Sequence, residues 1–305
     1  GNTVVFISHD LQEVLDKTDT ISVFRDGQYI DTVESREMTE DDLKRLMVGR
    51  ELDKKYFRSD FAASAMEETA LTAEHVTVPG LLEDVSLTLK KGEILGIGGL
   101  SESGMHELGK ALFGASFSRS GTVETGKGIL IDSVCTAIDN GIAYASKNRD
   151  SESCILNQSI RDNICLPSLQ ELSGKVLISD KVQNEFAQKY AELMSVKMQD
   201  TSQFVSNLSG GNKQKVVLAR WIGKNSDVLI LDSPTRGIDI KVKADIYALM
   251  EKLKAEGKAI LMISEEIMEL IVMSDRIIVM KDGTISGEFE RSELLSEEDI
   301  IKAMV

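Results

Sequence analysis

The stretch NLSGGNKQK at residues 207–215, followed by VLILD at residues 228–232, decides the fold of this chain. In the first stretch, Ser209, Gly210 and Gly211 stand at the start of a predicted helix, whose free N–H groups and dipole favour a phosphate. A serine and two glycines also form an ordinary helix cap, so this stretch alone is a weak signal. The second stretch is an apolar strand ending in an acid, the usual place for a carboxylate that holds Mg²⁺ near a nucleotide. Together they predict a nucleotide-associated α/β domain.

Apolar strands alternate with helical stretches on both sides of these motifs. Helical spacing predicts helices over residues 107–113, 182–194, 216–223 and 242–253. Short apolar runs predict strands over residues 93–98, 129–131, 142–145, 228–231 and 259–263. Because strands that alternate with helices usually form a parallel sheet covered on both faces, we predict a mixed α/β domain with a largely parallel central sheet.

The chain contains one long internal repeat. Residues 3–48 resemble residues 259–305, and Ile7 aligns with Ile263 at an offset of 256 residues (263 minus 7). This separation is too long for a solenoid unit and suits a duplicated whole domain. We therefore expect the end of a first copy at residues 1–50, a charged linker at residues 51–70 and a second copy at residues 71–305.

The first fifty residues are not expected to form a domain by themselves. They carry one predicted helix between strands, which buries too little surface for independent folding. Their first predicted strand, residues 4–7, has lost its sheet neighbours and leaves an edge that can pair with another chain. We expect disorder, docking onto the second copy, or exchange between molecules.

Composition excludes several classes of protein. Among 305 residues, 35 are Lys or Arg and 50 are Asp or Glu, which gives a net charge of −15. This balance argues against a general nucleic-acid binder and against a protein held on anionic lipid by its own charge. No apolar run approaches the ~20 residues of a membrane span. The three cysteines lack metal-binding spacing, which indicates reduced thiols in a cytosolic compartment.

The motifs resemble those of one family. LSGG at residues 208–211 and LILDSPTRGID at residues 229–239 look like the signature and Walker B/D-loop regions of ABC transporter ATPases. GEILGIGGL at residues 92–100 and SDRIIVMKDG at residues 274–283 are similar to the second copy in the duplicated ATP-binding subunit of ribose/galactose-type sugar importers. The resemblance covers essentially the whole chain, since residues 3–50 match the end of the first copy.

This resemblance implies a fold and a function. The fold is an ABC-type nucleotide-binding domain, with a mixed and largely parallel central sheet, a helical signature subdomain and an antiparallel β subdomain. The function is energy coupling by ATP and Mg²⁺ on the cytoplasmic side of the cell membrane. The implied partners are membrane permease subunits, a second ABC domain stacked head to tail and, indirectly, a periplasmic or surface sugar-binding protein. No nucleic acid is implied.

The phosphate loop departs from the family pattern Gly-x4-Gly-Lys-Ser/Thr. Met105 stands where a cation should meet the phosphates, His106 stands where a hydroxyl should bind Mg²⁺, and Glu102 adds a negative charge. By base rates, a lone histidine at this position is a surface or helix-start residue. We expect ATP and Mg²⁺ to bind weakly or not at all here. The nucleotide-binding positions that the resemblance assigns to this loop are Gly99, Ser101, Ser103, Gly104, Met105 and His106.

The resemblance also assigns catalytic positions. Asp232 is the Walker B acid and a weak candidate Mg²⁺ ligand, and Ser233 replaces the glutamate that usually follows it. Serine cannot act as a base unaided. The switch histidine of the first copy is His9, whereas the repeat places Glu265 at that position of the second copy. This chain alone is therefore expected to be inactive.

Another segment departs from the family in the same way. YASKNRD at residues 144–150 matches the stretch that senses nucleotide and touches the membrane subunit, which usually reads Ser-Glu-Asp-Arg. Lys147 and Asn148 replace both acids. By contrast, GIGGLS at residues 96–101 lacks the third glycine of a dinucleotide fingerprint, and no acid follows at the expected distance.

The intact signature and the altered phosphate loop together predict a machine with one ATP site. In the family, each nucleotide lies between the phosphate loop of one domain and the signature of the other. We expect this chain to offer its signature to ATP that is held by the other copy. The residues assigned to that contact are Ser209, Gly210, Gly211, Asn212, Gln214 and Asp239.

Two other functions compete with energy coupling for sugar import. A soluble ABC protein acting on ribosomes or DNA would need basic patches or long coiled-coil insertions, and neither is present in this acidic sequence. A catalytically inactive ABC scaffold or regulatory protein would share the altered loop. Nucleotide binding measured with an intact partner copy separates that scaffold from an energy-coupling subunit.

Overall fold

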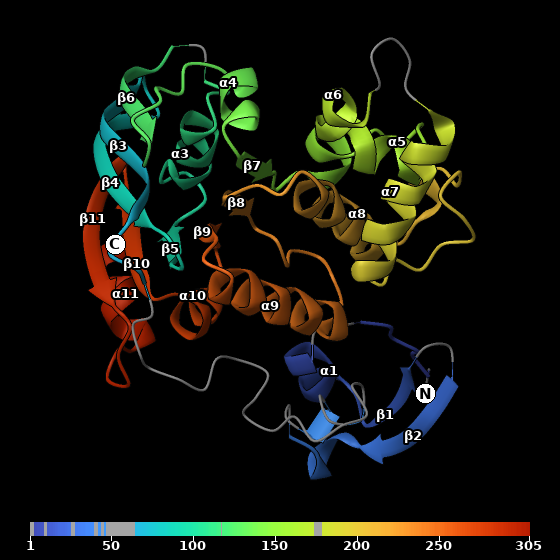
Figure 1. Cartoon of the computed structure of the whole chain (residues 1–305). Helices are drawn as coiled ribbons and strands as arrows, with labels where there is room; N and C mark the ends of the chain where they lie inside the picture. Colours follow the sequence, from blue (N-terminus) through green and yellow to red (C-terminus); the bar gives the residue numbers. More distant parts are fainter. Residues whose placement is uncertain are drawn as a thin grey trace.

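The computed structural model describes residues 3–8, 11–25, 28–39, 42–43, 46, 65–116, 118–173 and 179–305. A six-stranded sheet of strand order β11-β10-β5-β9-β8-β7 forms its centre (Figure 1). Only β11 runs antiparallel to its neighbour. The strands span Ile94–Gly99 (β5), Ile142–Ala145 (β7), Val228–Asp232 (β8), Ala259–Ile263 (β9), Arg276–Lys281 (β10) and Thr284–Glu290 (β11). Every residue of β5, β8 and β9 is buried, as expected of parallel strands covered on both faces.

A three-stranded antiparallel sheet of order β4-β3-β6 lies beside the central sheet. Its strands span Thr69–Val78 (β3), Leu82–Lys90 (β4) and Ser120–Thr125 (β6). Because β3 begins at Thr69, the linker predicted over residues 51–70 overlaps this strand by two residues. Residues 51–64 of that linker lie outside the described residues.

Helices fall into two groups in Figure 1. Those beside the sheets span Met105–Leu112 (α3), Val134–Asp139 (α4), Ile240–Ala255 (α9), Ile267–Met273 (α10) and Glu297–Met304 (α11). A separate helical part contains Ile160–Cys165 (α5), Leu169–Leu172 (α6), Asp180–Leu193 (α7) and Gly210–Gly223 (α8), with short turns Arg149–Ser153 (η3), Leu166–Ser168 (η4) and Val205–Asn207 (η5). Among the described residues, no helix is both long enough and apolar enough to cross a bilayer.

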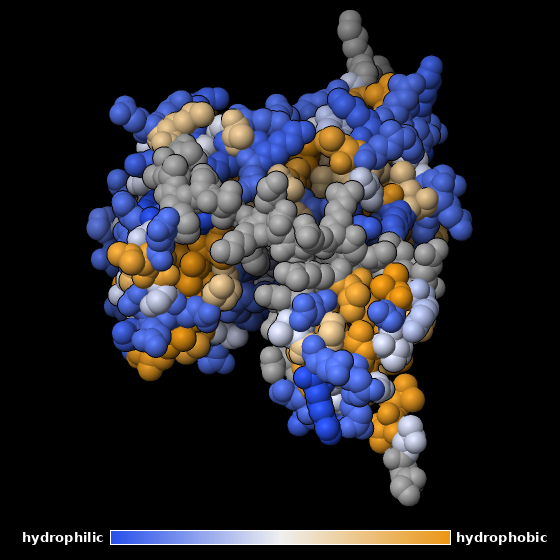
Figure 2. All heavy atoms as spheres, turned by 90° about the horizontal axis from the view of Figure 1, so that it is seen from below, coloured by the Kyte–Doolittle hydropathy of each residue, from blue (hydrophilic) through white to orange (hydrophobic). Residues whose placement is uncertain are grey.

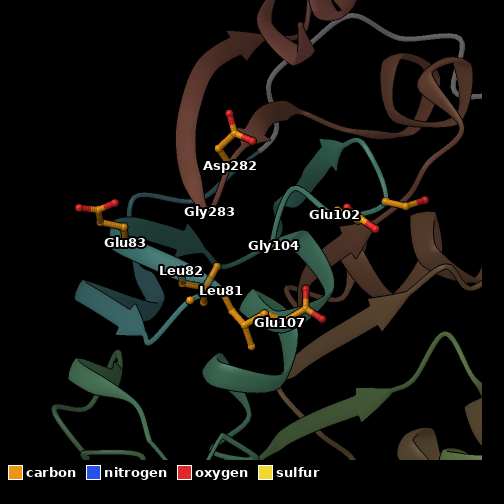
Figure 3. Close-up of a pocket in the computed structure, with 10 residues that line it drawn as sticks. Leu81, Leu82, Glu83, Glu102, Gly104, Glu107, Asp282 and Gly283 are labelled. Atoms are coloured by element: carbon orange, nitrogen blue, oxygen red, sulfur yellow. The ribbon is translucent and has the colours of Figure 1, made fainter.

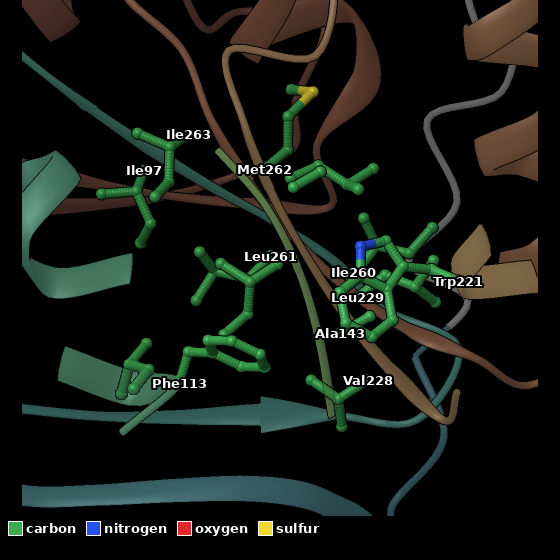
Figure 4. Close-up of a cluster of buried hydrophobic side chains, with 14 of the residues drawn as sticks. Ile97, Phe113, Ala143, Trp221, Val228, Leu229, Ile260, Leu261, Met262 and Ile263 are labelled. Carbon is green, nitrogen blue, oxygen red and sulfur yellow. The ribbon is translucent and has the colours of Figure 1, made fainter. Parts of the chain in front are cut away.

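One hydrophobic core joins the helical part to the central sheet. Trp221 of α8 lies among apolar side chains of β7, β8 and β9 (Figure 4). Its ring meets that of Phe113 edge to face, with the ring centroids 6.2 Å apart. Such aromatic pairs add about 0.5–1.5 kcal/mol beyond the area that they bury. The position of the signature helix is therefore tied to the sheet that carries Asp232.

Two predicted elements differ from the structure. The helix predicted over residues 216–223 begins earlier, at Gly210, because the Ser209 side chain accepts the N–H of Asn212 as an N-cap. Residues 129–131 form no strand of the central sheet. A turn in which the Gly128 N–H donates to the Thr125 carbonyl folds this segment back, and Leu130 forms a single bridge with Glu124 of β6.

The N-terminal part contains Leu11–Lys17 (α1), Thr20–Arg25 (β1), Gln28–Glu34 (β2) and Ser35–Glu37 (η1). The β1–β2 and β10–β11 hairpins have equivalent registers. Thr20 pairs with Glu34 and Arg276 pairs with Glu290, and both registers shift at the same relative position, after Val23 and after Val279. The same offset that relates the two sequences thus relates the two hairpins.

The N-terminal part packs a small core of its own. Leu11, Ile21, Val23 and Leu43 form its centre, and it reaches the rest of the chain through Ile240 at the start of α9. In Figure 1, α1 lies next to α9. This arrangement corresponds to docking, one of the three expected outcomes.

The strand predicted over residues 4–7 is not formed. The exposed apolar side chains of this segment are Val4, Val5, Phe6 and Ile7. Figure 2 shows hydrophobic side chains at the surface of the molecule on the side where the N-terminal part lies. The strand is missing because no neighbouring strand pairs with this segment among the described residues.

Deleting residues 1–50 should leave the melting temperature of the remaining chain nearly unchanged. The large core draws its buried residues from Ala70 to Met304, whereas the small N-terminal core is separate and, in the described part of the chain, packs against the partly buried Ile240 of α9. Thermal unfolding followed by circular dichroism measures the effect. A fall of many degrees would show that the N-terminal part contributes to the stability of the rest.

Candidate functional site

The loop between β5 and α3 keeps the backbone shape that its glycines require. Gly104 has φ +92° and is the N-cap of α3. A Cβ at this position would lie 2.7 Å from the carbonyl oxygen of Leu81, so only glycine fits there. Gly99 is equally constrained, because a Cβ there would lie 2.2 Å from Ser103 Oγ. The two glycines of the predicted phosphate loop are thus in place.

The two residues after Gly104 are both buried, and neither faces a ligand. Met105 is 0% exposed and packs in the hydrophobic core, so this position supplies no cation. His106 is also buried, in the first turn of α3, where its Nδ1 lies 2.7 Å from Oδ1 of Asp232. The expectation of a surface or helix-start histidine is half right: His106 starts a helix but is not at the surface.

Five side chains form a connected polar cluster, which we call the Lys147 network. Lys147 Nζ lies 2.7 Å from Glu265 Oε1 and 3.0 Å from His106 Nε2. The hydroxyl of Ser101 donates to the same Glu265 oxygen at 2.9 Å. The His106–Asp232 contact completes the network. The departures from the family pattern at residues 106, 147 and 265 are therefore in direct contact with one another.

Asp232 is fully engaged at the end of β8. It is 1% exposed, and its Oδ2 accepts the hydroxyl of Tyr144 at 3.1 Å while its Oδ1 meets His106. Ser233, which has φ +49°, also donates to Oδ1 at 3.3 Å. Both carboxylate oxygens thus have protein partners in the place where a Walker B acid would face Mg²⁺.

The electrostatics of the network follow from burial and from these contacts. The hydrogen bond from Lys147, with the one from Ser101, lowers the pKa of Glu265 to about 2 against the opposing effect of burial. Burial lowers the pKa of His106, but the hydrogen bond and charge of Asp232 outweigh it and raise that pKa above 6.5. Burial and the Asp232 charge raise the pKa of Tyr144, so it stays a donor. Glu265 is therefore ionised near neutral pH.

A pocket of about 610 Å³ is lined in part by Ser101, Glu102 and Gly104 of the phosphate loop (Figure 3). The backbone at Gly104 and Gly283 and the side chains of Leu81 and Leu82 form part of its wall. Four carboxylates line it and would repel a phosphate. They belong to Glu83, Glu102, Glu107 and Asp282. Within the described part of the chain, no three His, Cys, Asp or Glu side chains cluster as a metal site.

The residues around the phosphate loop do not fit MgATP. The cation position is an apolar side chain, the nearby Lys147 is bound to Glu265, and both oxygens of Asp232 have protein partners. Ser103 Oγ is buried with no hydrogen-bond partner, but one hydroxyl cannot replace the missing charges.

The signature residues lie apart from this network, at the start of α8. Ser209 is exposed and caps the helix, and Asn212 Nδ2 donates to its hydroxyl oxygen at 2.9 Å. A Cβ at Gly210 would lie 3.6 Å from the carbonyl oxygen of Gly237, so the signature adjoins the turn that leads to α9. Exposed Asp239 caps α9 by accepting the N–H of Val242.

The structure thus sorts the predicted site residues into two groups. The phosphate-loop group joins residues 99–106 to Asp232 and Ser233, whereas the signature group joins residues 209–212 to Asp239. Gln214 belongs to neither, because its side chain is buried within the helical part at 4% exposure. His9 lies outside the described residues.

Sequence reasoning missed the partners that complete the first group. Tyr144, Lys147 and Glu265 were not among the predicted binding residues, although the last two were noted as departures from the family. Their contact joins the ends of β7 and β9, which are not neighbours in the sheet. One feature of the sequence could have predicted the Lys147–Glu265 contact. Compared with the family pattern, a lysine replaces an acid at residue 147 and an acid replaces a histidine at residue 265, so the two changes introduce opposite charges.

Comparison with known proteins gives consistent results. A family model described as "ABC transporter" matches residues 82–236. The chain is 39% identical over 307 residues to the ribose import ATP-binding protein RbsA of Clostridium perfringens, covering 100% of this chain and 60% of that protein. It is 40% identical over 298 residues to RbsA of Lactococcus lactis, covering 97% and 60%. The chain therefore spans about 60% of the length of these curated relatives.

Solved structures show the same fold. A nucleotide-free ATP-binding cassette from an ABC transporter matches with a TM-score of 0.66 and 21% identity, covering 78% of this chain and 99% of that one. A dimeric cassette in a post-hydrolysis state with ADP and Pi matches with a TM-score of 0.64 and 21% identity, covering 73% and 100%. The expected α/β architecture, with its mostly parallel sheet, helical part and antiparallel sheet, is confirmed.

Replacing His106 with glutamine should remove a pH-dependent part of the chain's stability. Because the folded-state pKa of His106 is raised above 6.5, protonation stabilises the folded state fully below that value. The contribution is lost as pH rises through the folded pKa. Urea midpoints of the parent and the variant, measured from about pH 6 to pH 8, should therefore converge at the alkaline end.

His75 provides the control for this experiment. Its pKa is also raised, by Asp84, but its side chain is 79% exposed and solvent weakens the interaction. His75→Gln should change the urea midpoint little at any pH. A constant gap between the parent and His106→Gln across the pH range would contradict a titrating role for His106.

Proposed function

Because this chain belongs to the ABC transporter family, we propose that it is part of the ATP-binding, energy-coupling subunit of an ABC-type sugar importer. The similarity to ribose import ATP-binding proteins over essentially the whole chain supports this proposal. In it, residues 1–50 are the end of a first ABC domain, residues 51–70 are a linker and residues 71–305 are a second ABC domain. The equivalent registers of the two hairpins support the duplication.

The second domain is proposed to supply its signature to an ATP site on another ABC domain. One observation carries this proposal. The Lys147 network occupies the residues around the phosphate loop, whereas Ser209 and Asp239 stay exposed at the starts of α8 and α9. ATP and Mg²⁺ would be held by the other domain, which supplies the phosphate loop. In this chain, the Ser209 hydroxyl and the N–H groups of Gly210 and Gly211 would donate to the terminal phosphate, and the dipole of the 14-residue helix α8 would favour its charge.

The proposed partners follow from the family. Membrane permease subunits would bind the complete subunit on the cytoplasmic side of the membrane, where it would be peripheral, and a sugar-binding protein would take part indirectly. The net charge of −15 disfavours an action on ribosomes or DNA. The first-copy residue His9 would serve the catalytic site of the other domain.

A non-enzymatic ABC scaffold is the second candidate, and the sealed Lys147 network favours it as well. Both functions leave the second domain without ATPase activity of its own. They differ in whether the signature serine matters for hydrolysis elsewhere in the assembly. A scaffold would tolerate a large charged side chain at Ser209, whereas an energy-coupling subunit would not.

The chain alone should show no saturable binding of labelled ATP, with or without Mg²⁺. The phosphate loop has no cation for the phosphates and no hydroxyl for Mg²⁺, and the four carboxylates of the adjacent pocket would repel a triphosphate. Equilibrium titration with a fluorescent ATP analogue measures binding. Mg²⁺-dependent saturation that disappears in Asp232→Ala would overturn the proposal of a sealed site.

Ser209→Arg in the complete subunit, assembled with its membrane partners, should abolish both ATPase activity and transport. The added guanidinium would fill the place of the terminal phosphate at the start of α8. Ser202→Arg, which adds the same side chain at an exposed position upstream, is the matched control and should keep activity. Met105→Leu conserves volume in the core and should also keep activity, since this phosphate loop is not used. Equal losses in all three variants, or a silent Ser209→Arg, would refute the one-site function.

A further inference from the structure

The segment between β7 and α5 connects the Lys147 network to the signature helix. It begins at Ser146, carries Lys147 into the network and continues into η3. Hydrogen bonds within the segment hold its shape. The Ser146 hydroxyl donates to Glu152 Oε2 at 2.6 Å, Asn148 Nδ2 donates to Glu152 Oε1 at 3.0 Å, and the N–H of Glu152 donates to the carbonyl oxygen of Asn148 at 2.8 Å. A movement of Lys147 would therefore be passed to the residues that follow it.

The far side of this segment lies along α8, which it joins by two hydrogen bonds and approaches closely at a third place. Nη2 of Arg149 lies 3.0 Å from the position that a Cβ of Gly210 would take. Asp150 accepts from Lys213 Nζ at 3.0 Å, and the carbonyl oxygen of Ser153 accepts from Arg220 Nη1 at 2.7 Å. These contacts run from the first residue of α8 to its last turn. They fix both the place and the direction of the signature helix.

The other end of the connection is a partly buried ion pair. The side chains of Lys147 and Glu265 are 18% and 37% exposed, and Glu265 follows β9 in the central sheet. Two carboxylates, those of Asp232 and Glu265, face this end of the segment, and Lys147 is the cation that lies between Glu265 and His106. Without Lys147, Glu265 would keep Ser101 and the longer 3.4 Å contact with His106, but the segment would lose its side-chain link to Glu265 after β9.

We propose that Lys147 is a positioning residue, which holds the signature helix against the central sheet through the segment of residues 146–153 without any ligand. The ion pair of Lys147 with Glu265 anchors one end of that segment, and its hydrogen bonds with Lys213 and Arg220 anchor the other. Ser209 is thus kept in a fixed place for the other domain in every nucleotide state. This inference rests on the proposed function of the signature, but the geometry that it describes belongs to this chain alone.

A distance measurement on the full chain, without nucleotide, tests the proposal. One spin label is attached to exposed Cys135 of α4 and a second to a cysteine introduced at exposed Glu185 of α7, which packs against α8. Lys147→Met should broaden and shift the distance distribution measured by pulsed electron paramagnetic resonance. Lys224→Met removes an ion pair between α8 and Glu171, away from the network, and should leave the distribution unchanged.

A charge exchange separates positioning from simple damage to the fold. The double variant Lys147→Glu with Glu265→Lys restores opposite charges across the same contact and should recover the parent distribution. If Lys147→Met does not fold, Glu265→Gln removes the same ion pair and is judged by the same criterion. A Lys147→Met or Glu265→Gln distribution identical to that of the parent would overturn the inference.

Activity in the complete subunit gives a second readout. Lys147→Met should lower kcat by about tenfold with KM for ATP unchanged, because the other domain still holds the nucleotide. If Ser209→Arg left ATPase activity unchanged, the proposed function would be wrong, and the measured distance distribution alone would test the positioning role of Lys147. A shifted distance together with unchanged kcat would show that the anchor does not serve hydrolysis and would overturn that part of the inference.

Discussion

The charge of Asp232 is the constraint on which the rest of the site depends. This carboxylate stands at the end of a wholly buried strand, where an unpaired charge would cost several kcal/mol. His106 and Tyr144 satisfy it from α3 and β7, in the place of a metal ion. The second nitrogen of His106, Nε2, lies 3.0 Å from Lys147 Nζ, and Glu265 Oε1 balances the charge of Lys147 at 2.7 Å. The departures from the family pattern at residues 106, 147 and 265 thus form one connected set around Asp232.

The Lys147 network, whose side chains pair with one another, is structurally linked to the exposed signature at the start of α8. At an ordinary phosphate loop, the total charge of the site changes whenever a nucleotide binds or leaves, so the surrounding side chains must be stable with and without the nucleotide. Here side chains of the same chain pair with these charges, and the segment of residues 146–153 joins them to α8 through the hydrogen bonds to Lys213 and Arg220. Under the proposed function, the domain would present a fixed surface at Ser209 and would hold no nucleotide of its own.

The sequence was sufficient for the strands and for the positions of the motifs, and insufficient for the contacts between them. Strands β5, β8 and β9 were predictable because their apolar runs are buried on both faces. Ser209, Gly210 and Gly211 were assigned to a helix N-terminus, but the helix itself was predicted only over residues 216–223. The reason is that glycine and asparagine are weak helix formers, and the Ser209 cap overrides their preference. The Lys147–Glu265 pair was not predictable because the two residues are 118 positions apart and meet only through the order of strands in the sheet.

The matching registers of the β1–β2 and β10–β11 hairpins have a consequence for how the chain folds. In the native sheet, β10 pairs with β5, and β1 is a strand of the same length with a bulge at the equivalent position. While the chain is still unfolded, β1 can therefore compete with β10 for the edge of β5, and a neighbouring molecule can offer the same strand. Internal duplication of this kind favours kinetic traps and strand exchange between molecules. Refolding of this protein should thus become slower and less complete as its concentration rises, even though each native contact is individually favourable.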